Sequence, residues 1–149
     1  MFWAGRINVK SIFGSLFKKE QAPSSSAPDG RIANKRLSDQ QRRRLEQKLQ
    51  AWIDAKGYCL PDRTVADAAS RIGTHSLLLY RYFAQQGTDF RTWRSQLRIQ
   101  DAKEQLLAYP GVPASVIGRR VGITDRSNFT RQFKAFVGEL PDTWRNNQK

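Results

Sequence analysis

The stretch that decides the fold is residues 113–138, which read PASVIGRRVGITDRSNFTRQFKAFVG. Its first part is typical of a short helix, because Pro113 suits a first turn and Val116, Ile117 and Val121 recur at helical spacing. Its second part is typical of another helix, with phenylalanines on an inner face and a glycine at the end. Two short helices separated by a glycine and a tight turn predict a helix-turn-helix unit.

The same pattern occurs earlier in the chain, in residues 64–86. Thr64 is a good N-cap for a short helix that stops at Gly73. A second helix follows at once, and its apolar face is expected to contain Leu79 and Phe83. The chain therefore carries the helix-turn-helix pattern twice, as an internal repeat.

A long helix over residues 89–109 connects the two units. Its pattern places these apolar side chains inward: Phe90, Trp93, Leu97, Ala102, Leu106 and Leu107. Another helix, capped by Ser38 and ended by Gly57, precedes the first unit. No run of residues alternates between apolar and polar, so we expect no sheet. The predicted fold class is all-α, with two helix-turn-helix subdomains joined by a long central helix.

Net charge limits the class of partner. The chain of 149 residues carries 26 Lys and Arg against 13 Asp and Glu, which gives a formal charge of +13. A cationic protein of this kind attracts nucleic acid or an anionic membrane surface. Cys59 is the only cysteine, so no internal disulfide can form. No apolar run reaches the roughly 20 residues of a membrane-spanning helix, and we expect a cytoplasmic protein.

Catalytic and metal-binding chemistry is not indicated. His75 is the only histidine, and its one soft partner, Cys59, is distant in the chain, whereas a zinc site needs several ligands. No base stands beside a cysteine or serine to activate a nucleophile, and no glycine-rich loop could cradle a phosphate. We therefore expect no cofactor, no metal and no enzymatic activity.

The second helix of the later unit has the side chains that a DNA-reading helix needs. In a helix-turn-helix the first helix braces the second, whose exposed face enters the major groove. Arg126, Ser127 and Arg131 face solvent when the phenylalanines face the core, and arginine can bond guanine with two donors. We expect these three residues to read bases. The residues expected to contact phosphate are Asn128, Thr130 and Lys134.

The second helix of the earlier unit is less polar. Tyr80 and Arg81 are expected to contact bases and Ser76 to contact phosphate, although Tyr80 can also simply cover the edge of the core. Leu77 can meet a thymine methyl group or can be an ordinary surface residue. This unit should therefore contribute less hydrogen-bonded base specificity than the later one.

These patterns resemble the C-terminal DNA-binding domain of AraC/XylS-type transcription regulators. Residues 98–107 (RIQDAKEQLL) are similar to the family's linker-helix pattern. Residues 116–123 (VIGRRVGI), 128–134 (NFTRQFK) and 138–145 (GELPDTWR) are similar to its patterns for the second helix-turn-helix unit and the turn after it. The resemblance covers roughly residues 64–145, and matches spaced this densely are highly specific.

The resemblance implies a homeodomain-like fold of about seven helices. It also implies that both recognition helices enter successive major grooves on one face of the DNA, ~34 Å apart. By position, it implies base contacts from Leu77, Tyr80, Arg81, Arg126, Ser127 and Arg131.

The chain departs from the family pattern in four respects, one of which is Ile123 in place of the usual phenylalanine. Gly118 stands where the family usually has alanine, and a glycine inside a helix costs up to about 1 kcal/mol. His75 stands where a serine often caps the first recognition helix, which leaves Thr74 as the expected cap. Relatives mostly carry a ligand-sensing or dimerising domain ahead of this module, whereas the residues that precede it here are too few to form one.

Three segments divide the chain, at residues 1–20, 21–36 and 37–149. The first has apolar residues at helical spacing beside lysines, which is typical of a short amphipathic helix. The second is rich in proline and serine, as flexible linkers are. The third is the DNA-binding domain, with helix-turn-helix units at about 64–86 and 113–137.

The role of residues 1–20 stays open at this point. The segment can make weak contact with a partner protein or an anionic membrane surface, or it can be a disordered tail. It can also be the remnant of a longer sensor-regulator whose output fragment is this domain.

The favoured interpretation is a sequence-specific transcription regulator that binds double-stranded DNA. It would act with RNA polymerase or another regulator, and it could form a homodimer. The alternative is an interaction or membrane-tethered module whose helix-turn-helix units no longer read DNA, and the leucines at and after Leu77 motivate it.

Overall fold

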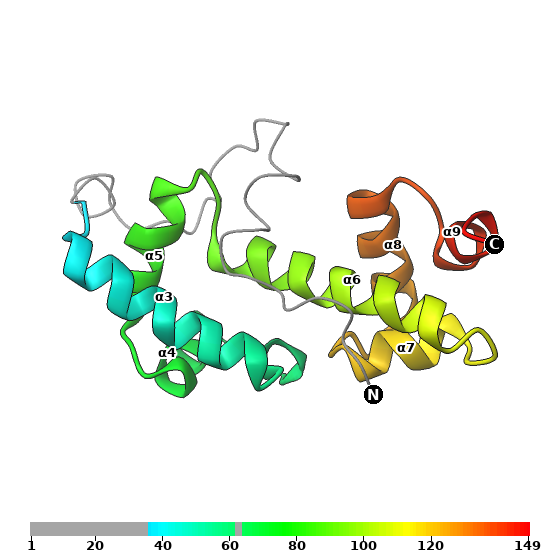
Figure 1. Cartoon of the computed structure of the whole chain (residues 1–149), viewed down its shortest axis with the longest axis horizontal. Helices are drawn as coiled ribbons and strands as arrows, with labels where there is room; N and C mark the ends of the chain where they lie inside the picture. The colour runs from blue at the N-terminus through cyan, green and yellow to red at the C-terminus, as the bar shows by residue number, and fades with distance from the viewer. Residues whose placement is uncertain (1–35, 62–63) are drawn as a thin grey trace. The chain divides into compact units, whose positions relative to one another are not determined.

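Helices make up the regular secondary structure of the described part of the chain. The computed structural model describes residues 36–61 and 64–149. Their elements are α3 (Asp39–Asp54), a 3-10 helix (Gly57–Cys59), α4 (Val65–Ile72), α5 (Ser76–Gln85), α6 (Phe90–Ala108), α7 (Ala114–Arg120), α8 (Arg126–Val137) and α9 (Pro141–Asn147). No strand occurs in these two ranges, and the predicted all-α fold class is confirmed (Figure 1). The predicted segment 1–20 and the predicted linker 21–36, apart from its last residue, lie outside the described residues.

The described residues divide into two compact units. The N-terminal unit contains residues 36–57 and 64–93, with α3, α4 and α5. The C-terminal unit contains Tyr58–Pro61 and Arg94–Lys149, with α7, α8 and α9. Helix α6 begins in the first unit and continues in the second. Each unit therefore holds one complete pair of helix-turn-helix helices.

Capping residues set the start of α3 and both ends of α4, as the sequence predicts. Ser38 Oγ accepts the backbone N–H of Gln41 at 3.1 Å, and Gln41 Oε1 accepts the backbone N–H of Ser38 at 3.0 Å. Thr64 begins α4 in the same reciprocal way with Asp67. These caps satisfy amide groups that have no partner within the helix. Gly73 ends α4 with a left-handed φ of 88°, a conformation that glycine adopts without strain.

An aromatic cluster forms the core of the N-terminal unit. The indole rings of Trp52 and Trp93 stack with their centroids 5.8 Å apart, and the Phe83 ring lies 4.9 Å from that of Trp93. Tyr82 Oη of α5 donates a hydrogen bond to Glu46 Oε1 of α3 at 3.1 Å. Burial, and then the Glu46 charge, raise the pKa of Tyr82. The hydroxyl therefore keeps its proton and ties α5 to α3.

Helices α6, α7 and α8 share one apolar core in the C-terminal unit. Its buried members are Ile99, Ala102, Leu106, Ile117, Val121, Ile123, Phe129 and Phe133. Trp144 of α9 packs against this cluster, with its ring centroid 5.8 Å from that of Phe133. The core therefore forms where the helical spacing of apolar residues predicts it.

Two details of the sequence-based prediction are wrong. Leu107 does not point inward but is 51% exposed. Leu106 takes the core-facing position, and the next residue is turned by about 100° around the helix. Thr74 does not cap α5, because His75 occupies the N-cap position and makes no side-chain hydrogen bond there. This helix therefore begins without the cap that a serine would supply.

The segment Tyr58–Pro61 belongs to the C-terminal unit, although it lies in the sequence between two parts of the N-terminal unit. We call it the crossing segment. Arg98 of α6 holds it, because Nε donates to the carbonyl oxygen of Tyr58 and Nη2 donates to that of Leu60 at 3.0 Å. Tyr58 Oη donates to the buried Asp101 carboxylate at 2.9 Å. Burial, and then the Asp101 charge, raise the pKa of Tyr58, so its hydroxyl stays protonated.

Gly118 lies inside α7 at a place where α8 approaches closely. A Cβ atom added at Gly118 would lie 2.7 Å from Cγ of Phe129 and 2.9 Å from its Cδ2. The missing side chain leaves room for this ring. Aromatic packing therefore compensates for the low helix propensity of glycine.

We expect Gly118→Ala to lower the free energy of unfolding by about 1–2 kcal/mol, although alanine is the better helix former. The added methyl group must displace a buried ring, and this overpacking outweighs the gain in helix propensity. Urea unfolding followed by circular dichroism measures the change. Gly111→Ala is the matched control, because nothing lies within 4 Å of its added Cβ. A Gly118→Ala protein more stable than wild type would contradict the packing argument.

Candidate nucleic-acid interface

Helix α8 follows α7 as the second helix of the C-terminal helix-turn-helix unit. Asp125 begins it, since Oδ1 accepts the backbone N–H of Asn128 at 2.6 Å, and Gly138 ends it with a left-handed φ of 93°. Phe129 and Phe133 are buried, with their ring centroids 5.9 Å apart. This packing fixes which face of α8 points outward.

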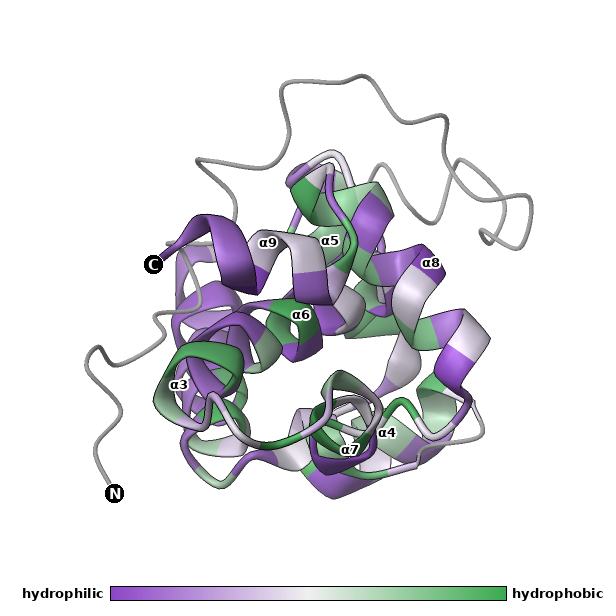
Figure 2. Cartoon of the chain, turned by 90° about the vertical axis from the view of Figure 1, so that its right-hand side faces the viewer, coloured by the Kyte–Doolittle hydropathy of each residue, from purple (hydrophilic) through white to green (hydrophobic). Residues whose placement is uncertain are grey.

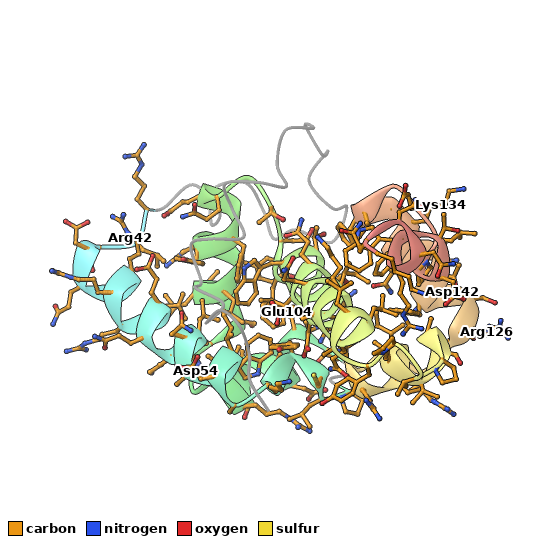
Figure 3. All side chains as sticks on the ribbon, turned by 45° about the vertical axis from the view of Figure 1, so that its right-hand side comes forward. Arg42, Asp54, Glu104, Arg126, Lys134 and Asp142 are labelled. Carbon is orange, nitrogen blue, oxygen red and sulfur yellow. The ribbon has the colours of Figure 1, made fainter. Side chains whose placement is uncertain are left out.

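The outward face of α8 is polar and basic. Its exposed residues are Arg126, Ser127, Arg131 and Lys134, and its half-buried ones are Asn128 and Thr130. Hydrophilic and hydrophobic bands alternate along α8 in Figure 2, as expected for a helix with one buried and one exposed face. Figure 3 shows the side chains of Arg126 and Lys134 extending away from the ribbon.

Three hydrogen bonds order this outward face. Arg131 Nη2 donates to Asn128 Oδ1 at 2.9 Å, and Gln132 Nε2 donates to the same oxygen at 3.0 Å. Thr130 Oγ1 donates to the carbonyl oxygen of Arg126 at 3.0 Å, so Thr130 must turn its hydroxyl before it can donate to a phosphate. The sequence reasoning did not single out Gln132. Its position in the sequence could have indicated it, because Gln132 comes four residues after Asn128 and side chains at this spacing meet on one helix face.

In the N-terminal unit, α4 and α5 form the other helix-turn-helix pair. Lys48 Nζ of α3 donates to the carbonyl oxygen of Gly73 at 2.6 Å, which holds the turn between the two helices. Leu79 and Phe83 of α5 are buried. This recognition helix therefore also has a fixed outward face.

The outward face of α5 is less polar than that of α8. Leu77 is 37% exposed, and Ser76, Tyr80 and Arg81 are half-buried. The structure therefore distributes the predicted contact residues over two helices, with one set in each unit. Whether these residues contact bases or phosphates stays a prediction.

Comparison with known proteins assigns the chain to a family. A family model described as a helix-turn-helix domain matches residues 68–147, which are more than half of the chain. The chain belongs to the AraC-type helix-turn-helix family. The match begins within α4 and extends to the end of α9, so it includes both recognition helices. The resemblance found in the sequence is confirmed.

Bacterial relatives of this AraC-type chain match the same region. Transcriptional activator NphR from Rhodococcus sp is 29% identical over 84 residues, which are 56% of this chain and 25% of that protein. The uncharacterized HTH-type transcriptional regulator Mb1430 from Mycobacterium bovis is 31% identical over 81 residues, which are 54% of this chain and 23% of the regulator. The chain therefore spans about a quarter of the length of the curated relatives that it matches.

A solved structure of an AraC-type domain has a similar fold. It is the C-terminal domain of AraT, a response regulator from Geobacillus stearothermophilus, with a TM-score of 0.59 and 26% sequence identity. The similarity covers 76% of this chain and 88% of that one.

Two buried arginines of the AraC-type C-terminal unit, Arg98 and Arg145, have structural roles that were not predicted from the sequence. Arg98 holds the crossing segment, as described above. Arg145 of α9 donates from its guanidinium to the carbonyl oxygens of Leu106, Tyr109, Pro110 and Val112. The available signal for Arg145 was its position four residues after Pro141, on the inward face of α9, where both are buried. These arginines therefore bind backbone carbonyls within the unit rather than face solvent.

The described ranges contain neither a metal-site candidate nor a membrane span. Within residues 36–61 and 64–149, no group of three or more His, Cys, Asp or Glu could hold a metal ion. No helix in that part of the chain combines the length and apolar character needed to cross a membrane.

Proposed function

We propose that this chain is a sequence-specific DNA-binding transcription regulator, in which α5 and α8 read two adjacent major grooves. The main support for this proposal is the outward face of α8. There Arg126, Ser127 and Arg131 are exposed, on the side of the helix opposite the buried phenylalanines. The major groove admits one helix, and guanine offers there two acceptors that an arginine can bond together. The formal charge of +13 supports attraction to the phosphate backbone.

Each recognition helix is assigned both kinds of contact. The proposed base contacts are Leu77, Tyr80, Arg81, Arg126, Ser127 and Arg131. The proposed phosphate contacts are Ser76, Asn128, Thr130 and Lys134. Phosphate contacts set the register of the protein on the duplex, and base contacts supply specificity. The two helices would enter grooves one helical turn apart, ~34 Å.

The proposal extends to partners and location. Double-stranded DNA is the principal partner of residues 37–149, and RNA polymerase or a second regulator receives the signal. A homodimer is compatible with such a role. The protein acts in the cytoplasm and catalyses no reaction. The names of the bacterial relatives, which are regulators, support this assignment.

Selection of bound sites from a random DNA pool tests the function directly. We expect the full chain to enrich a motif with two parts separated by one helical turn. A pool that shows no enriched sequence, at a salt concentration where the protein still binds DNA, would refute specific reading.

We expect Arg131→Ala to cost about 1–3 kcal/mol in binding to the selected site and to relax the preference at one base pair. Fluorescence anisotropy titrations on selected and random DNA measure the effect. Lys134→Ala, on the same helix face, is the matched control, because loss of a phosphate contact weakens both DNAs alike and reduces the salt slope by about 1. Equal losses for Arg131→Ala on the two DNAs would contradict base reading.

A further inference from the structure

One side-chain amide on α8 accepts two hydrogen bonds at the same oxygen. Asn128 Oδ1 accepts Arg131 Nη2 at 2.9 Å and Gln132 Nε2 at 3.0 Å. The two donors lie three and four residues further along the helix, where side chains of neighbouring turns meet. A residue of its own helix therefore holds the exposed Arg131 guanidinium in place.

Gln132 anchors the other end of this network. Its side chain is half-buried, and its Oε1 atom is buried. A side chain whose end is enclosed by packed atoms changes rotamer less freely than an exposed one. Gln132 therefore keeps Asn128 in the orientation in which Oδ1 faces Arg131.

The bond to Asn128 leaves Arg131 able to read a base. A guanidinium has five N–H donors in a planar fork, and this bond uses a donor on Nη2. The remaining donors can bond O6 and N7 of guanine. Because the asparagine amide is neutral, it orients the arginine without cancelling the positive charge that attracts DNA.

We propose that Asn128 is a positioning residue for Arg131: its Oδ1, held by Gln132, preorganises the guanidinium for its base. This role rests on the proposed function and is additional to a phosphate contact by the same side chain. A long arginine side chain loses rotamer entropy when DNA immobilises it. An arginine that is already held loses less, so the affinity for the matching base increases.

A double-mutant cycle on the full chain tests this role with Asn128→Ala, Arg131→Ala and the double variant. The measured quantity is the ratio of affinities for the selected site and for random DNA, so a shared phosphate contact cancels. We expect Asn128→Ala to lower this ratio by about two- to tenfold and to relax the same base pair as Arg131→Ala. The double variant should match Arg131→Ala within about twofold, because the two residues act as one unit.

Asn128→Asp is the matched variant, because it keeps an oxygen acceptor at the same position. The base preference at the Arg131 position should be retained. Affinity for selected and random DNA should fall alike, because the new negative charge repels phosphates. Alanine is a better helix former than asparagine, so Asn128→Ala should fold, and thermal unfolding by circular dichroism checks this.

Additive losses in the cycle would overturn the positioning role, and so would an Asn128→Ala protein that keeps its preference at the Arg131 base pair. Loss of that preference in Asn128→Asp would overturn it as well. These three outcomes concern the variants alone. If the wild-type chain still selects a motif, they refute the positioning role and leave the proposed function standing. A wild-type chain that selects no motif would refute the proposed function and the positioning role together.

Discussion

Arg145→Ala is expected to lower the free energy of unfolding by about 3–5 kcal/mol. Arg145 is only 9% exposed. Its guanidinium donates to the carbonyl oxygens of Leu106 at 3.0 Å, Val112 at 2.7 Å, Pro110 at 3.4 Å and Tyr109 at 3.5 Å. One side chain therefore satisfies acceptors over the whole connection between α6 and α7.

The size of this effect follows from where the acceptors lie. The last carbonyls of a helix have no partner within the helix, and α6 ends at Ala108, next to these oxygens. The Leu106 carbonyl lies in a buried contact and is left desolvated when it loses its donor, and hydrogen bonds from charged donors are among the stronger ones. The cation also opposes the negative end of the α6 dipole. Asp142 lies 4.0 Å from Arg145 Nη1 and is mostly exposed, so this ion pair contributes little.

Urea unfolding followed by circular dichroism measures the loss. Arg145→Lys should be intermediate, because an ammonium group is a compact charge that cannot reach all of these oxygens. Arg119→Ala, at an exposed arginine of α7, is the matched control and should stay within about 0.5 kcal/mol of wild type. If Arg145→Ala unfolds at the same urea concentration as this control, the carbonyls do not depend on the guanidinium.

Gly122→Ala is expected to lower the free energy of unfolding by about 3–4 kcal/mol, through two separate effects. Gly122 follows α7 with a φ of 99°, where a side chain costs about 1–2 kcal/mol. An added Cβ would also lie 2.6 Å from the carbonyl oxygen of Cys59 and 3.0 Å from its carbonyl carbon. These are backbone atoms of the crossing segment, which Arg98 holds on both sides of Cys59. The segment therefore cannot move away easily.

Gly138→Ala separates the two effects in the same unfolding measurement. Gly138 has a φ of 93°, but nothing lies within 4 Å of an added Cβ. Its substitution should show the backbone strain alone, about 1–2 kcal/mol. The difference in free energy of unfolding between the two variants measures crowding against the crossing segment. If the two variants lose the same free energy, the crossing segment moves aside without a measurable loss of stability.

Helix ends and the apolar core could be predicted because local rules govern them. Thr64 and Asp125 cap through amide groups three residues away, so the sequence itself contains both partners. The inner faces of α7 and α8 follow from the spacing of their apolar residues. The failure at Leu107 shows the limit, because helical spacing alone does not decide whether the neighbour of a buried residue is also covered. Trp52 and Ile53 of α3 are both buried, whereas Leu107, next to the buried Leu106, is 51% exposed.

Buried charges could not be predicted in this way, because their partners are distant in the sequence. Arg98 donates to a carbonyl 40 residues earlier, and Arg145 donates to one 39 residues earlier. No spacing rule connects such positions before the fold is known.

The candidate site was predictable in part. The outward face of α8 follows from its buried phenylalanines. The shared acceptor at Asn128 does not follow from the sequence, because several side chains on that face are close enough to pair.

The C-terminal unit is discontinuous in sequence, and this matters for modular exchange between regulators. A fragment that starts at Arg94 would include α7, α8 and α9, but it would remove the Tyr58 hydroxyl that donates to Asp101 and two carbonyls that accept from Arg98. A buried carboxylate that loses a hydrogen-bond donor destabilises the fold around it. The family match, over residues 68–147, also begins after this segment. Recombination that transplants the second recognition helix into another protein must therefore also carry residues 58–61, which lie outside the contiguous fragment.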